Sequence, residues 1–143
     1  MSLTFKAMIN NITNRFYVQI QQGYSDIDLT GKVLYDNVEN FEKPDNALWV
    51  RFSITPINTE QTSLGTNKRF RTVGVAVAQI FNPLGTGYDD AMDLSDAIKT
   101  AFRSLNADSI VYRTPYIENV GRTEGGHYQI NVTIPFYADD VED

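Results

Sequence analysis

Apolar residues recur along this chain with two different periods, which predict two helices and a set of strands. Over residues 4–22 they repeat every three to four positions, as on one side of a helix. Thr4 is suited to cap the start of this helix, and Gly23 to end it in a left-handed conformation. The same spacing over residues 90–105 predicts a second helix, and aspartates at its start suit the positive end of the helix dipole.

Alternation of apolar and polar residues predicts strands that bury one face. The pattern is clear over residues 47–57, where we expect Pro56 to end the strand, and over residues 127–137. A further strand is predicted over residues 110–120, with an edge position or a bulge at Pro115 because proline has no amide hydrogen to donate.

Residues 69–81 predict the central strand of the sheet, because apolar residues occupy both of its faces. On one face Gly74, Ala76 and Ala78 have little or no side chain. We expect that face to be shallow enough for another subunit to approach closely.

The remaining segments are predicted to connect or flank these elements. Residues 32–35 suit a short edge strand, and residues 37–46 form a charged loop with a proline. Residues 58–68 form a long polar connection of the kind that is often functional or disordered. Residues 121–126 predict a hairpin turn, and residues 138–143 predict an acidic, frayed tail.

Together these elements predict an α+β fold: a two-layer domain in which two helices pack on one face of a mainly antiparallel sheet of four to five strands. The length of 143 residues is typical of a single domain, and we expect residues 1–143 to form one. We find no internal repeat in the chain.

Composition and charge exclude several classes of site. The chain has no cysteine and one histidine, which excludes structural disulfides and thiolate metal sites. Its net charge of −6 argues against a protein that grips DNA, because such proteins carry a basic face for the phosphates. We expect no signal peptide at the start and no membrane span, because no apolar run is long enough.

The turn between the central strand and the second helix lies where phosphate-binding loops are found. Gly85 and Gly87 fit such a loop, but a P-loop needs Lys and then Ser or Thr after its last glycine. Here Tyr88, Asp89 and Asp90 follow, and the two carboxylates would repel a phosphate. We interpret the segment as a structural turn.

Other candidates for chemistry are also weak. His127 is the only histidine and lies on the polar side of a predicted strand, where we expect it to face solvent or an interface. Asp89, Asp90, Asp93 and Asp96 lack calcium-loop spacing, and helix capping explains the first three. We therefore expect no enzyme activity, no metal and no cofactor.

The polar face of the predicted sheet has the composition of an interface. Aromatic residues and arginine are enriched at protein interfaces. The alternative is a solvated face with one exposed tryptophan. The residues that we expect to project from this face are Trp49, Arg51, Arg113, Gln129, Asn131 and Thr133.

In the order of its elements and in several sequence segments, the chain resembles the tail terminator proteins of long-tailed bacteriophages and prophages. The resemblance covers nearly the whole chain and rests on core and turn patterns. The segments that carry the resemblance are FKAMINNITNRF, NALWVRFSITP, RFRTVGVAVAQIF followed by NPLGTGYDDAMDLSDAIKTAF, and GGHYQINVTIPFYADD.

This resemblance implies a structural virion protein that forms a ring, typically a hexamer, at the head-proximal end of the tail tube. The ring stops tube growth and presents a surface to the head connector. The implied partners are other copies of the chain, the major tail tube protein and a head connector or completion protein, while genomic DNA passes without specific binding. The implied location is the virion tail, assembled in the bacterial host cytoplasm. In that family the loop that corresponds to residues 58–68 faces a neighbour, and there is no active site.

A cyclic ring needs two different complementary patches on each subunit. The polar sheet face is one candidate patch, and a helix flank with its acidic cap is the other. An acidic lumen would repel DNA phosphates. The residues expected to contact another subunit or the tail tube are Trp49, Arg51, Thr59, Gln61, Leu64, Asn67, Lys68, Arg69, Arg113, Gln129 and Asn131.

Two other functions stay open on the sequence alone. One is a different head–tail connector, tail completion or tail-tube component with a similar α+β core. The other is a small-molecule-binding or enzymatic domain that uses the sheet face as a pocket wall.

Overall fold

The computed structural model describes residues 3–36, 47–61, 70–85, 87, 89–103, 106–107, 109–123, 126–139 and 141–142. Its helices are α1 (Phe5–Phe16), the π-helix η1 (Tyr17–Gln22) that continues it, and α2 (Asp89–Phe102). Its strands are β1 (Leu3–Thr4), β2 (Val33–Tyr35), β3 (Trp49–Gln61), β4 (Phe70–Pro83), β5 (Asn106–Ala107), β6 (Ile110–Tyr112), β7 (Tyr116–Arg122), β8 (His127–Asp139) and β9 (Val141–Glu142).

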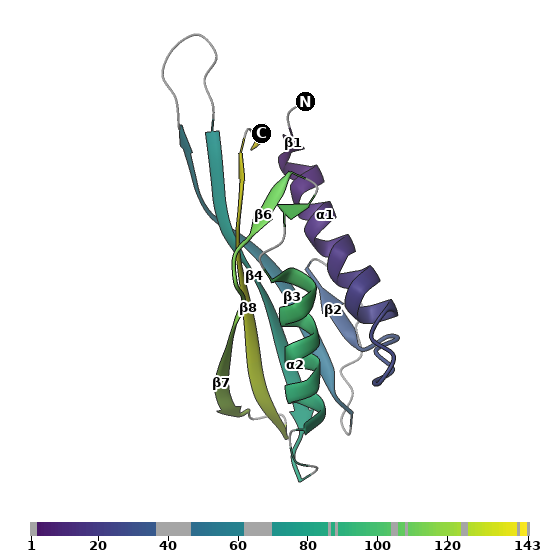
Figure 1. Ribbon diagram of the computed structural model, residues 1–143. Coiled ribbons are helices and arrows are strands. Elements are labelled where there is room, and N and C mark those ends of the chain that lie inside the picture. The colour runs from purple at the N-terminus through teal and green to yellow at the C-terminus, as the bar shows by residue number, and fades with distance from the viewer. Residues whose placement is uncertain are drawn as a thin grey trace.

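The main sheet has the order β2-β3-β4-β8-β6-β5, and β7 also pairs with β8. Every pair in it is antiparallel except β2 with β3. The helices α1 and α2 pack on the same side of this sheet (Figure 1). The predicted two-layer α+β class is therefore confirmed, and short strands such as β2, β5 and β6 widen the sheet beyond the expected four to five strands.

The core lies between the helices and one face of the sheet. Because β-strand side chains alternate, every second residue of β3, β4 and β8 points toward the helices. Among the described residues, several apolar side chains of the helices and the sheet are almost fully buried here. They are Met8, Ile12, Phe16, Val50, Phe52, Ile80, Leu94, Ile98, Phe102, Ile130, Val132, Ile134 and Phe136.

Gly74, Ala76 and Ala78 of β4 also face this core, which corrects the expectation that another subunit approaches them. Ala76 and Ala78 are completely buried. At Gly74 an added Cβ would lie 2.7 Å from the ring of Phe136 and 2.8 Å from the carbonyl oxygen of Thr55. The small residues of β4 make room for the protein's own side chains, so they do not mark an intersubunit contact.

The first helix begins as the sequence predicts but ends differently. The amide of Ala7 donates to Thr4 Oγ1 at 3.0 Å, so Thr4 is the N-cap. At Tyr17 the winding changes to a π-helix, which runs to Gln22. Gly23 was expected to be left-handed, but its φ of −86° and ψ of −23° are right-handed. A Cβ there would lie 2.8 Å from two backbone carbonyl oxygens of the preceding turn, so close packing explains this glycine.

The strand β3 continues past Pro56, although we expected it to end there. Pro56 pairs with Gly74, and a bulge lies between Pro56 and Asn58. A proline is tolerated because, among the described residues, β2 covers only Val50–Phe52 on the other side of β3. Residues 58–61 were expected in a connection but pair with residues 70–73.

Further along the chain, the remaining strands mostly follow the prediction. The expected strand over residues 110–120 is interrupted around Pro115 into β6 and β7. β7 and β8 form the predicted hairpin, and Gly121 and Gly126 have positive φ values of 111° and 79°.

The end of the chain is more ordered than the predicted acidic tail. Ala138 and Asp139 belong to β8, and Ala138 is fully buried. Residues 141–142 pair in parallel with Leu3–Thr4 near the start of α1. The prediction of a frayed end from residue 138 is therefore wrong for these residues, because both chain ends meet beside the sheet.

Candidate functional site

The face of the main sheet that points away from the helices is the candidate site, and we call it the open face. Strand register places Arg51, Gln79 and Asn131 in one row across β3, β4 and β8, and Thr55, Val75 and Pro135 in another. The full set consists of Arg51, Ser53 and Thr55 of β3, Val73, Val75, Val77 and Gln79 of β4, and Asn131, Thr133, Pro135 and Tyr137 of β8.

An uncharged strip runs along the middle of the open face. It consists of Val73, Val75 and Val77, which we call the valine strip. Val73 is 36% exposed, and the other two are half-buried. On β7, Tyr116 lies opposite Thr133 and is 53% exposed. Exposed apolar side chains at the centre of a polar face are typical of the core of a protein interface.

Arginines surround this strip. Arg51 is exposed on β3, and Arg113 is exposed after β6, with its guanidinium 5.2 Å from the ring centre of Tyr137. The guanidinium of Arg71 lies over the same ring at 4.2 Å and donates to both carboxylate oxygens of Asp139, at 2.7 and 3.2 Å. Hydrogen bonding to Asp139 raises the pKa of Arg71. The open face therefore has an apolar centre and a charged edge.

Five of the predicted interface residues lie on the same side of the sheet as the valine strip, namely Trp49, Arg51, Arg113, Gln129 and Asn131. Arg51 and Arg113 are exposed, as expected of contact residues. Gln129 and Asn131 are half-buried, and Gln129 Nε2 donates to Asn131 Oδ1 at 2.9 Å. These amides therefore bind each other along β8.

Trp49 was expected to project from the polar face as an exposed aromatic residue, but it is only 7% exposed. Its ring stacks on Phe81 with centroids 4.2 Å apart and an interplanar angle of 13°. The register pairs these two residues across β3 and β4. Trp49 therefore packs within the protein, and Tyr116 is the more exposed aromatic residue.

The end of β3 holds two more predicted residues. Thr59 and Gln61 are exposed. Thr59 pairs with the buried Thr72, and their hydroxyl oxygens are 3.1 Å apart, so Thr59 does not lie on the open face. The predicted contact residues outside the described part of the chain are Leu64, Asn67, Lys68 and Arg69.

His127 is completely buried, so the expectation that it faces solvent is wrong. Its Nε2 lies 3.4 Å from the carbonyl oxygen of Ala47. The backbone carbonyl of His127 accepts from the amide and the hydroxyl of Thr123, which holds the β7–β8 turn. His127 therefore packs inside the fold.

The glycine turn before α2 has the geometry of a connection. Gly85 and Gly87 have φ values of +87° and +72°, where glycine is favoured, and a Cβ on either would touch nothing within 4 Å. Asp89 and Asp90 follow, exposed in the first turn of α2. Thr86 and Tyr88 lie outside the described residues.

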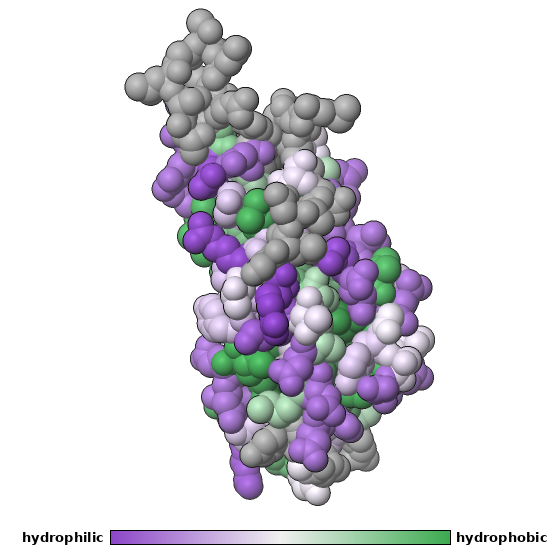
Figure 2. All heavy atoms as spheres, viewed as in Figure 1, coloured by the Kyte–Doolittle hydropathy of each residue, from purple (hydrophilic) through white to green (hydrophobic). Residues whose placement is uncertain are grey.

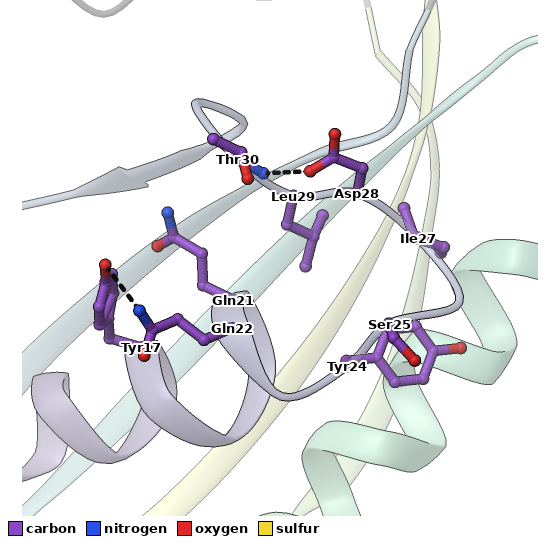
Figure 3. A pocket seen from close by; sticks show the side chains of 9 residues that line it. All are labelled: Tyr17, Gln21, Gln22, Tyr24, Ser25, Ile27, Asp28, Leu29 and Thr30. Atoms are coloured by element: carbon purple, nitrogen blue, oxygen red, sulfur yellow. Dashed lines mark hydrogen bonds between the residues drawn. The ribbon is translucent and has the colours of Figure 1, made fainter.

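A hollow of about 490 Å³ lies at the end of η1 (Figure 3). Some of its polar groups bind within the chain: Asp28 Oδ1 accepts from the amide of Thr30, and Gln22 donates to the hydroxyl of Tyr17. The hydrogen bond from Thr30 lowers the pKa of Asp28. These two hydrogen bonds therefore hold parts of the wall of the hollow in place.

The described part of the chain holds neither a cluster of metal ligands nor a membrane-spanning helix. No group of three or more His, Cys, Asp or Glu residues there is placed to hold a metal ion. No described helix is long and apolar enough to cross a membrane.

Sequence reasoning missed the valine strip and Tyr116. The signal was present, because Val73, Val75 and Val77 alternate with Gly74, Ala76 and Ala78. Assigning the valines to the open face requires knowing that the helices cover the smaller residues, which depends on how Phe136 fills the space beside Gly74.

The fold is that of an α+β protein with helices on one side of a mostly antiparallel sheet. The sequence model of one family, described as phage tail terminator protein, matches residues 23–136. The chain belongs to this family, so it is a structural component of a phage tail that interacts with other phage tail and head proteins.

Comparison with solved structures supports the fold of this chain and says nothing of its function. One solved structure is 14% identical with a TM-score of 0.62, covering 91% of this chain and 94% of that chain, and its name states no function. A search of curated proteins found no match.

Proposed function

We propose that this protein assembles as a ring at the head-proximal end of the tail tube, stops tube growth and presents a surface to the head connector. Membership of the tail terminator family carries the proposal. The open face supports it, because an exposed apolar strip with charged groups around it is suited to a protein contact.

The proposed ring is a hexamer of this chain. In a closed cyclic ring each subunit contacts its two neighbours through two different surfaces. The open face is suited to be one of them. The ring itself binds the major tail tube protein at one end and the head connector at the other.

The acidity of the chain supports passage of DNA through the ring without specific binding. The net charge is −6. Acidic groups near a lumen repel phosphates and prevent DNA from adhering to its wall. In the view of Figure 2, hydrophilic side chains cover most of the described surface, with separate small hydrophobic areas.

Native mass measurement combined with negative-stain imaging tests the ring. The expected result is a species near six times the 16.2 kDa of one chain, visible as rings free in solution or on tube ends. A protein that stays monomeric at every concentration, and also when purified tail tubes are added, contradicts the proposal.

A further inference from the structure

Two arginines of the open face have no ionic partner among the described residues, namely Arg51 and Arg113. Arg71 differs, because Asp139 binds it and Glu60 lies opposite it on β3. Two other described acids lie near the open face: Asp36, whose carboxylate accepts from the amide of Ile54 at 3.1 Å, and Glu118, in the same row as Arg51. Three strand spacings separate Glu118 from Arg51, about 14 Å, too far for an ion pair. The two arginines are therefore available to an acidic partner.

The valine strip lies between these two arginines. Arg51 is in the row of Asn131, and the amide of Arg113 donates to the carbonyl of Pro135, four residues further along β8. Three strand spacings and four residues of rise place the two Cα atoms about 20 Å apart along a diagonal. Val77 lies close to the middle of this diagonal. A partner that binds both arginines therefore also covers the strip.

The solvent side of α2 has matching chemistry. Asp89, Met92, Asp93 and Asp96 are spaced as i, i+3, i+4 and i+7, so they share one side of the helix. All four are exposed, and Met92 is 40% exposed. The side of α2 toward the sheet is occupied by buried residues such as Leu94 and Ile98. The exposed side therefore presents an apolar side chain surrounded by carboxylates.

The spacing of the α2 aspartates also fits the separation of the two arginines. Asp89 and Asp96 are seven residues apart, about 10 Å along a helix. Long arginine side chains at both ends of a diagonal of about 20 Å can reach carboxylates at this spacing. Met92 then lies near Val77, where an unbranched thioether adapts to a flat apolar surface.

We infer that a second copy of this chain covers the open face, with the solvent side of its α2 on the valine strip and its aspartates facing Arg51 and Arg113. The inference rests on the proposed ring and names its subunit contact. Two copies with a net charge of −6 repel each other, so a contact that joins opposite charges is favoured over others. The contact joins two different surfaces, as a ring requires.

Charge reversal tests this contact. The sheet variant is Arg51→Glu with Arg113→Glu, and the helix variant is Asp93→Arg with Asp96→Arg. Each variant alone is expected to require at least tenfold higher concentration to form rings, because like charges meet at every contact. An equimolar mixture is expected to assemble like the wild type, because every contact in an alternating ring again joins opposite charges.

Matched controls carry similar charge changes elsewhere on the surface. Lys6→Glu reverses an exposed cation at the start of α1, and Asp28→Arg reverses an exposed aspartate after η1. These controls are expected to assemble like the wild type. Circular dichroism and the thermal midpoint of each variant establish that it is folded.

Three outcomes overturn the inference: either variant assembles like the wild type, the folded variants fail to assemble when mixed, or the sheet variant forms rings but no longer binds tubes. The last result would assign the open face to the tail tube protein. If the wild type ends tube growth and charge reversal changes nothing, only this inference fails. If the wild type neither forms rings nor ends tube growth, the proposed function fails as well.

Discussion

At the scale of single residues, burial decides which substitutions the fold tolerates. Ile98 lies on the side of α2 that packs against the sheet and has no exposed surface. Its neighbour Leu94 is equally buried, and Ser95 satisfies its hydroxyl by donating to the carbonyl of Ala91 at 2.7 Å. This part of the interface is apolar, and a carboxylate placed there would lack a partner.

Ile98→Asp is therefore expected to unfold the domain or lower its free energy of unfolding by more than about 4 kcal/mol, a large part of typical domain stability. Leu94→Asp is expected to behave in the same way. The control is Thr100→Asp, an exposed position on the same helix, which should change stability by less than about 0.5 kcal/mol. Urea unfolding followed by circular dichroism measures the free energy of unfolding of the core variants and of the control. Equal stability of Ile98→Asp and Thr100→Asp would contradict the packing of α2.

Residue-scale prediction from the sequence succeeded for strand faces and failed for individual burial. Alternation assigned Val50 and Phe52 to the core face and Arg51 to the other, as the structure shows. It also placed Trp49 and His127 on the polar face, where both are buried. Alternation gives the direction of a side chain, but burial depends on what covers it, and the stacking of Trp49 on Phe81 becomes visible only with strand register.

At the scale of elements, Tyr35 joins the short strand β2 to the end of the first helix. Its hydroxyl donates to Gln21 Oε1 of η1 at 2.6 Å. Its ring contacts Phe16 and Phe52 edge-on, at centroid distances of 6.2 and 6.3 Å. Burial raises the pKa of Tyr35 well above its ordinary value near 10.

This shift predicts a loss of stability at alkaline pH. Below about pH 10 Tyr35 is protonated in both states, so its contribution is fully present. As the pH rises further, the unfolded state releases the proton while the folded state keeps it, and the free energy of unfolding falls. Tyr35→Phe should flatten this decline between pH 10 and 11 in urea titrations, whereas the exposed control Tyr116→Phe should not. If the free energy of unfolding of Tyr35→Phe falls with pH as steeply as that of the wild type, the loss of stability does not come from Tyr35.

Elements were predicted well where a long periodic pattern specified them. Both helices, the central strand and the β7–β8 hairpin follow directly from spacing and turn residues. The extension of β3 past Pro56 could not be predicted, because it depends on a partner strand on one side and little cover on the other. The pairing of residues 141–142 with Leu3–Thr4 joins the two ends of the chain, and local patterns carry no signal for it.

At the scale of the whole molecule, the two sides of the sheet have separate roles. The helices cover one side and form the core, while the other side presents the valine strip and its arginines. The acidic side of α2 and the open face lie on different surfaces of one chain, which suits assembly into a ring. The two-layer architecture followed from the sequence, whereas the composition of the open face required the register of three strands.

The most direct test of the proposed function is the length of tail tubes polymerised in the presence of this protein. Purified tail tube subunits are assembled with increasing amounts of the wild-type chain, and tube lengths are measured by electron microscopy. The proposal predicts shorter tubes as the ratio rises, with a ring on one end of each tube and no further growth from that end. Tubes that keep their full length distribution and carry no ring at a saturating amount of the folded protein would contradict it.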